Sequence, residues 1–193
     1  MPFDFPKLFT PVMDRFGPAV LGASEFRRQQ LLRIKREFNV PILKFLRDEP
    51  MAKFEMLTDV TCVDSLRLPD DMIKEYPERF AVVYQLTSIS HNERLRVKAY
   101  VPEDPCEIDT VSTLWECANW GEREAYDFFG IIFKGHPDLK RILMPDYYEG
   151  YPLRKDYPLK GRGERDSFPK WANAYHLDPD SRAADPVTRS VEK

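Results

Sequence analysis

The chain has 193 residues, 42% of them hydrophobic, which is enough for one domain with a core and an appendage. Its formal net charge of −3 speaks against a protein that binds nucleic acid through its overall field. No run of about 18 apolar residues is present, so no membrane-spanning helix is expected. The three cysteines form no C-x-x-C pair, which argues against a disulfide framework, a zinc site or an iron–sulfur cluster within the chain. The proline-rich start does not resemble a signal peptide, and we expect the protein to act in the compartment where it is made.

The first part of the chain predicts short elements. Residues 1–23 contain scattered Phe, Pro and Gly without a period, which indicates an extended arm. Leu32 and Ile34 alternate with basic residues, as in a half-buried strand. Residues 40–48 have apolar side chains at helical spacing and Pro41 in the first turn, which predicts a short amphipathic helix. The next stretch predicts a helical turn at 54–59, a strand at 61–66 and an exposed loop at 69–78.

The clearest strands come next. Both faces of 80–87 carry apolar residues, which is typical of an interior strand. Residues 94–101 alternate apolar with basic or polar side chains and end before Pro102, which predicts a strand with one face exposed to water. The short connection between the two strands predicts an antiparallel hairpin.

A helix is predicted over 113–129, with the capping box Thr113-Leu-Trp-Glu116 at its start and Gly130 as its stop. Small residues, Gly121 among them, lie in the middle of its apolar stripe and would let it approach a sheet closely. A short strand should follow at 131–133.

Beyond Gly135 the spacing of prolines prevents sustained helix. The fold class is therefore α+β: a small, mostly antiparallel or mixed sheet packed with helices, followed by a long extended C-terminal segment. We expect an N-terminal arm at 1–23, an α+β domain at 24–134, and a partner-binding segment with a tail at 135–193. From about residue 161 the tail is polar and contains proline, as in segments that are disordered alone.

Four charged residues gather on the predicted helix. Arg123 and Asp127 are four residues apart, which favours an ion pair on a charged helix face. Glu122 and Glu124 complete the set, and the alternative interpretation is a catalytic dyad of carboxylates. His136 lies in a Gly-His-Pro turn and has no second histidine at metal-ligand spacing, which favours structural hydrogen bonds over a role as base or ligand.

Tyrosines and basic residues interleave in "YYEGYPLRKDYPL". The acidic residues among them argue against a nucleic-acid platform. Tyr and Arg are enriched at interface hot spots, and prolines reduce the entropy lost on docking, so we expect this segment to lie over another protein. The expected interface residues are His136, Arg141, Tyr151, Arg154, Lys155, Asp156 and Tyr157.

The stretch "EREAYDFFGIIFKGHPDLKRIL" resembles the pattern of the 30 kDa subunit family of respiratory complex I, the proton-pumping NADH–quinone oxidoreductase. "GYPLRKDYPL" and weaker stretches in the expected order extend the resemblance over about residues 24–160. It implies an α+β subunit of the peripheral arm with no catalytic, cofactor or metal residues of its own. FMN, the iron–sulfur clusters and the quinone would be bound by partner subunits.

The implied neighbours are subunits D, B and I, of which I would lie near the tail, on the cytoplasmic side of the bacterial inner membrane. Two alternatives remain open at this point. One is a homologous subunit of a membrane-bound [NiFe] hydrogenase or of an F420- or ferredoxin-linked complex. The other is a stand-alone binding module.

Overall fold

A computed structural model describes residues 5–27 and 29–162. The chain divides into two units between Tyr157 and Pro158, and the fold described here is that of the first. The prediction for the tail from about residue 161 falls almost entirely outside the described residues.

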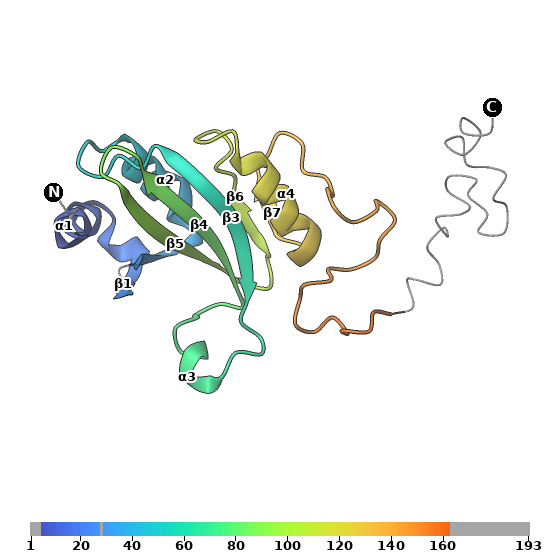
Figure 1. Cartoon of the computed structure of the whole chain (residues 1–193). Coiled ribbons are helices and arrows are strands. Elements are labelled where there is room, and N and C mark those ends of the chain that lie inside the picture. Colours follow the sequence, from blue (N-terminus) through green and yellow to red (C-terminus); the bar gives the residue numbers. More distant parts are fainter. Residues whose placement is uncertain (1–4, 28, 163–193) are drawn as a thin grey trace, which may run out of the picture. The chain divides into compact units, whose positions relative to one another are not determined.

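Five strands form a mixed sheet in the order β1-β2-β5-β4-β3 (Figure 1). The pairs β1–β2, β5–β4 and β4–β3 are antiparallel, whereas β2 and β5 are parallel. The strands are β1 Val20–Phe26, β2 Gln29–Lys35, β3 Met56–Asp64, β4 Phe80–Ser88 and β5 Glu93–Val101. This sheet and its helices confirm the predicted α+β class, the β4–β5 hairpin and the interior position of β4.

Helices and two small strands complete the first unit. The helices are α1 Phe5–Phe16, α2 Asn39–Asp48, α3 Asp70–Ile73 and α4 Ala118–Phe129, with short 3-10 turns at Gly17–Ala19 and Arg36–Phe38. Strand β6 Glu107–Asp109 pairs in parallel with β7 Ile132–Lys134, so the segments before and after α4 are tied together. Residues 135–162 contain no further helix or strand, as predicted.

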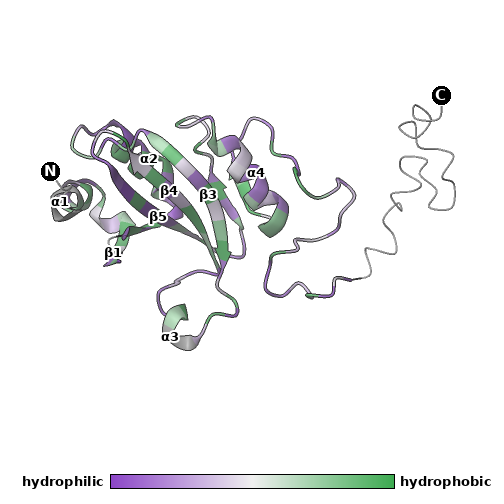
Figure 2. Ribbon diagram, viewed as in Figure 1, coloured by the Kyte–Doolittle hydropathy of each residue, from purple (hydrophilic) through white to green (hydrophobic). Residues whose placement is uncertain are grey.

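The core lies on one face of the sheet. On β5, Leu95, Val97 and Ala99 are buried, while the alternating Arg94 is exposed. Figure 2 shows the same alternation as hydrophobic and hydrophilic bands along β3. Helix α2 buries Ile42, Leu43 and Leu46 in this core, which confirms the amphipathic helix predicted there.

The extended structure predicted for the N-terminal arm is wrong for residues 5–23. Helix α1 and edge strand β1 occupy that stretch, although Pro11 lies inside the helix. Phe9, Val12 and Phe16 recur at steps of three and four and pack against the core. That apolar stripe gives the helix a tertiary contact that outweighs the cost of proline.

Other local predictions are also corrected. The helical turn predicted at 54–59 is wrong: residues 56–59 form the start of β3, because pairing with β4 overrides local propensity, and 54–55 lead into it without regular structure. The 69–78 loop contains the four-residue helix α3. The capping box is not formed: residues 111–117 make turns, and α4 begins after Cys117, which makes no side-chain cap bond.

Helix α4 packs directly against edge strand β3 (Figure 1). A Cβ atom added at Gly121 would lie 2.9 Å from both the Cβ and the carbonyl oxygen of Val60. Gly121 thus permits the close approach that the small-residue stripe predicts. Gly130 ends the helix in the left-handed conformation, with φ of 74°, as expected for a helix stop.

We predict that Gly121→Ala lowers the free energy of unfolding by about 1–3 kcal/mol, because the strand backbone cannot move away from the new methyl group. The higher helix propensity of Ala would by itself raise the free energy of unfolding by about 1 kcal/mol. Urea unfolding monitored by circular dichroism measures the difference. Gly17→Ala is the matched control, since its Cβ would meet only the end of Met13 at 4.0 Å. A Gly121→Ala variant more stable than the parent would contradict the packing described.

Candidate functional site

Two carboxylates of α4 are buried rather than displayed on a charged face. Glu122 and Asp127 have 0% relative exposure, whereas Glu124 is exposed. The predicted Arg123–Asp127 ion pair is wrong. Arg123 instead donates from Nε to the carbonyl oxygen of Lys140 and from Nη2 to that of Arg141, each at 3.2 Å. Arg123 therefore binds the segment that follows the helix instead of a residue of the helix itself.

Asp127 binds the chain beyond the helix. Its Oδ2 accepts the backbone N–H groups of Ile142, Leu143 and Met144 at 3.0, 2.8 and 2.8 Å, and its Oδ1 accepts Arg141 Nη1 at 2.7 Å. Burial raises the pKa of Asp127, but the bonds from Met144 N–H, Arg141 and the other amides outweigh it and hold the pKa below its ordinary value. The ionised carboxylate thus organises a turn of backbone around itself.

Arg141 extends this arrangement. Its Nη2 donates to the carbonyl oxygens of Tyr148 and Gly150, both at 3.0 Å. The guanidinium lies 5.8 Å from the ring centroid of Tyr148 and 5.5 Å from that of Tyr151. One arginine thereby joins Asp127 to a loop seven to nine residues farther along.

Arg154 ties the segment to the end of α4. Its Nε donates to the carbonyl oxygen of Phe129 at 2.6 Å, and its guanidinium lies 4.6 Å from the Tyr151 centroid and 5.1 Å from that of Phe80. The Tyr151 ring also covers Gly130, where an added Cβ would lie 2.4 Å from it. A side chain at Gly130 would therefore displace the tyrosine.

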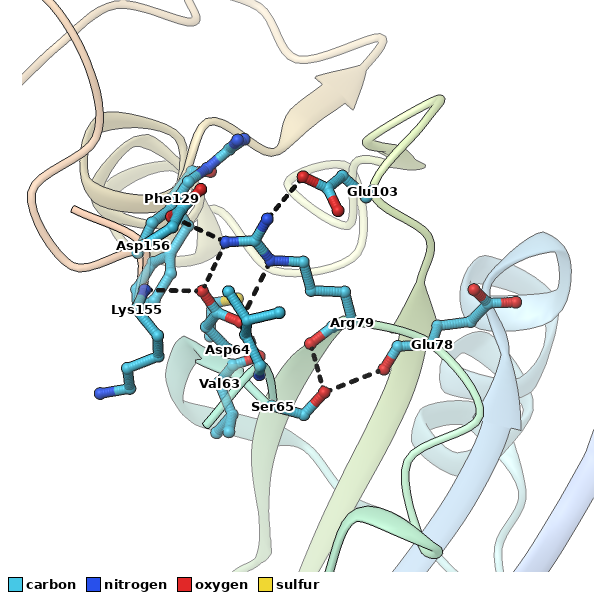
Figure 3. Close-up of polar contacts among 12 residues, drawn as sticks. Val63, Asp64, Ser65, Glu78, Arg79, Glu103, Phe129, Lys155 and Asp156 are labelled. Carbon is cyan, nitrogen blue, oxygen red and sulfur yellow. Dashed lines mark hydrogen bonds and ion pairs between the residues drawn. The ribbon is translucent and has the colours of Figure 1, made fainter. Parts of the chain in front are cut away.

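A second ionic cluster is centred on Arg79 (Figure 3). Arg79 donates from Nε and Nη2 to the two oxygens of buried Asp64 at 3.3 and 3.0 Å, and from Nη2 to Asp156 at 2.8 Å. Glu103 accepts from its Nη1. Asp64 also accepts the backbone N–H of Lys155 at 2.8 Å. Asp64 also accepts the backbone N–H of Leu66 at 3.0 Å. Burial raises the pKa of Asp64, but Arg79 and the N–H groups of Lys155 and Leu66 outweigh it and lower the pKa overall.

We call residues 136–157 the C-terminal strap. The Asp127 cluster holds its first part and the Arg79 cluster holds its end. All seven interface residues predicted from the sequence lie on it: His136, Arg141, Tyr151, Arg154, Lys155, Asp156 and Tyr157. Arg141, Tyr151, Arg154 and Asp156 make the contacts above, and Tyr157 bonds the hydroxyl of Tyr148 at 2.6 Å. Lys155 is exposed, and its backbone binds Asp64.

The sequence interpretation missed Asp64, Arg79 and these intramolecular roles. Asp64 ends β3 and pairs in register with Phe80, the residue after Arg79. Opposite charges at the two facing strand ends were the available signal. Contact of the seven strap residues with a partner stays a prediction.

Glu122 and His136 form a third buried pair. Glu122 accepts the backbone N–H of Val111 at 2.7 Å and the hydroxyl of Thr110. His136 Nε2 lies 3.9 Å from the Glu122 carboxylate, and neither side chain is exposed. His136 Nδ1 accepts the N–H of Asp138 at 3.1 Å, which leaves Nε2–H to donate to the Asn119 carbonyl at 3.3 Å. The structural hydrogen bonds predicted for His136 are present.

The pKa of Glu122 is raised to about 7, because burial outweighs its bonds from Thr110 and Val111. Burial also lowers the pKa of His136; the hydrogen bond to the Asn119 carbonyl raises it by a smaller amount. A raised carboxyl pKa and a lowered imidazole pKa both favour the neutral forms of Glu122 and His136. The Glu122–His136 pair can therefore hold a proton.

A metal site is a separate question: residues 5–27 and 29–162 contain no group of three or more His, Cys, Asp or Glu placed to bind a metal ion.

We predict that Asp127→Asn lowers the free energy of unfolding by about 2–4 kcal/mol, because the amide cannot replace the charge that Arg141 and three N–H groups require. Amide exchange at Leu143 and Met144 should accelerate in the folded protein. Asp138→Asn, on the exposed part of the strap, is the control. Unchanged protection of the two amides in Asp127→Asn would contradict the role given to Asp127.

We predict a pH effect for Glu122→Gln. A carboxyl whose pKa rises from 4.5 to about 7 on folding contributes stability that is complete below pH 4.5 and is lost as the pH rises through about 7. The parent should therefore lose up to about 3 kcal/mol over this window, and the Gln variant should not. The titration of His136 is common to both proteins. Urea unfolding from pH 4.5 to 8.5 measures the difference, with Glu124→Gln as control. Parallel curves for parent and Gln variant would refute it.

Comparison with known proteins gives concordant matches. The family model described as "Respiratory-chain NADH dehydrogenase, 30 Kd subunit" matches residues 32–163. The C subunit of the NADH-quinone oxidoreductase of Geobacter metallireducens is 51% identical over 150 residues, which are 78% of this chain and 87% of that protein. The protein of the same name from Geotalea uraniireducens is 48% identical over 77% of this chain and 84% of its own length.

Two solved structures share the fold. A structure described as the trypsin-resistant fragment of Nqo5 matches with a TM-score of 0.59 and 33% identity, over 70% of this chain and 98% of that chain. A chain from the archaeal membrane-bound sulfane sulfur reductase matches with a TM-score of 0.64 over 80% of this chain and 86% of that chain; its 22% identity speaks for the fold alone. The family match runs from within β2 through β3–β5, α4 and the C-terminal strap, and this chain therefore belongs to the family of the 30 kDa subunit of respiratory-chain NADH dehydrogenase.

Proposed function

We propose that this chain is a structural and assembly subunit in the peripheral arm of a proton-pumping NADH:quinone oxidoreductase. It bears no cofactor itself. Electrons would pass from NADH through FMN and iron–sulfur centres to quinone on neighbouring subunits. The chain takes part in an oxidoreductase without an active site of its own.

One observation carries this proposal: most polar groups of the family pattern, apart from the exposed Glu124, are engaged inside the chain's own fold, several of them with the strap. Asp127 binds four donors, Arg123 and Arg141 bind carbonyl oxygens, and Glu122 is enclosed by Thr110 and Val111. Groups with their hydrogen-bonding capacity satisfied inside the fold are suited to fixing a shape. A substrate would need some of them free.

The strap supplies the second support. Held at both ends, it presents Tyr147, Leu153 and Leu143, which are 56%, 48% and 62% exposed. Apolar side chains on a rigid irregular segment suit contact with another protein, since little conformational entropy is lost on docking. The partners we propose are subunits D, B and I, the last of them near the tail.

The place of action follows from those partners. We propose a peripheral position on the cytoplasmic side of the bacterial inner membrane. In the part of the chain that the structure describes, no helix has the length and apolarity to cross a bilayer. The sulfane sulfur reductase match means that this fold occurs in another respiratory membrane complex. A related complex, such as a hydrogenase, is therefore the competing assignment, and the relatives at about half identity favour the first.

The test is purification of the tagged chain from membranes of its own cells in mild detergent, with mass spectrometry of the co-purified proteins. We expect subunits D and B, together with the NADH-oxidising flavoprotein. Hydrogenase subunits in their place would select the competing assignment, and a chain recovered alone would refute a role in any complex.

The isolated chain should contain neither iron nor flavin and should not oxidise NADH. Metal analysis and an absorption spectrum check this on the purified protein. Stoichiometric iron or a flavin band would contradict the assignment of all redox groups to the neighbours.

A further inference from the structure

A groove lies between α4 and the edge strand β3. It has a volume of about 320 Å³ and is open to solvent on one side. Its lining comes from the strand, the helix and the start of the strap: Leu57, Thr58, Asp59, Val60, Cys117, Trp120, Gly121, Glu124, Ile142 and Leu143. The β3–β4 register shifts between Leu57 and Asp59, and such an irregularity turns the edge of a strand away from regular pairing.

The groove exposes two large apolar side chains. Trp120 from α4 and Leu143 from the strap are each 62% exposed. Both residues are held by neighbouring groups of α4 and the strap. The backbone N–H of Leu143 is bound by Asp127, and the Trp120 ring lies 5.3 Å from the Arg123 guanidinium, which is itself fixed by strap carbonyls. Exposed apolar groups in a rigid setting are typical of a binding surface, because docking on them costs little ordering.

The charge of the groove indicates which kind of side chain could bind in it. Asp59 and Glu124 line it, and no Lys or Arg does. Within residues 5–27 and 29–162, no salt bridge engages either carboxylate. An anionic surface such as a phospholipid headgroup layer would meet two like charges here. A basic side chain would meet two carboxylates, while the Trp120 ring, which already has Arg123 as its cation partner, offers apolar surface beside them.

We propose that this groove is a docking site for a basic, apolar segment of a neighbouring protein subunit. The segment places an Arg or Lys between Asp59 and Glu124 and an apolar side chain against Trp120 and Leu143. This inference rests on the proposed function, which requires a neighbouring subunit, and it locates one contact surface on β3 and α4 in addition to the strap. Trp120 is the expected hot spot, since Trp is enriched among residues that dominate binding energy.

The experiment uses the tagged full chain in its own cells. Trp120→Ala and Glu124→Lys are each expected to lower recovery of the other subunits, with about a thirtyfold loss of affinity for the tryptophan variant. Ile89→Ala and Glu25→Lys are the controls. Ile89 is 68% exposed in the β4–β5 turn, and Glu25 is exposed on β1 at the opposite edge of the sheet. Both controls should co-purify like the parent.

The outcomes separate the two proposals. If the parent recovers the complex and both groove variants do so equally well, the groove proposal is overturned and the proposed function stands. If the parent recovers no other subunit, the proposed function fails and the groove proposal falls with it. Thermal melting of each isolated variant identifies loss of folding, and Glu124→Lys, on an exposed position, then decides alone.

A photo-crosslinking amino acid at position 120 identifies the occupant in the assembled complex. A crosslinked peptide of another subunit with Lys or Arg within a few residues of the crosslink supports the proposal. A crosslink to lipid, to a second copy of this chain or to an acidic peptide overturns it.

Discussion

The Asp127 carboxylate is the constraint on which the second half of this structure depends. A carboxylate without exposed surface is costly unless charged and polar donors surround it. Helix α4 supplies none of those donors from its own face, so they must come from the chain that follows. Three consecutive N–H groups and one guanidinium meet the requirement, and in meeting it they bend the backbone at 141–144 and fix where the strap begins.

The end of the strap is held by the same kind of chemistry from a different direction. Asp64 belongs to β3 and Arg79 precedes β4, and their ion pair involves no residue of the strap. The strap adds the Asp156 carboxylate and the Lys155 amide to it. With Arg154 bound to Phe129, three contacts close the segment onto the sheet and α4. An irregular segment thus obtains from side chains the hydrogen bonds that a helix or strand would have made within its own backbone.

Sequence reasoning succeeded where the controlling interactions are local. The alternation along β4 and β5 and the stop at Gly130 follow from residues a few positions apart, and the structure agrees. It failed where distant residues compete. Arg123 and Asp127 satisfy the spacing for an i, i+4 pair, but Arg141 can reach Asp127 together with three backbone amides, and a buried carboxylate favours the larger number of donors.

The same limit applies to the candidate site. The pattern indicated that Arg141, Tyr151 and Arg154 act as anchors, but residue type alone does not specify what an anchor binds. Arg141 binds Asp127 across 14 residues, and Arg154 binds Phe129 across 25. Arg79 likewise binds Asp64 across 15 residues. Nothing in local propensity encodes such pairs. The groove could not be predicted from the sequence either, because β3, α4 and the strap, which are separate in the chain, form it together.

The three buried acids differ in what satisfies them, and this sets their charge. Asp64 and Asp127 each bind an arginine and at least two backbone N–H groups, so the ionised form is favoured and the pKa falls. Glu122 has only neutral donors, a hydroxyl and one amide, so burial prevails and the pKa rises to about 7. His136, whose Nε2 lies 3.9 Å from the Glu122 carboxylate, has its pKa lowered by burial. One helix therefore carries, at Asp127, a carboxylate whose charged form is favoured and, five residues earlier, a carboxyl whose pKa is raised to about 7. Glu122 binds the Val111 amide ahead of α4 and lies 3.9 Å from His136 at the start of the strap, so a change in its charge acts on the segments before and after α4. The lowered pKa values of Asp127 and Asp64 favour the charged forms that bind the strap.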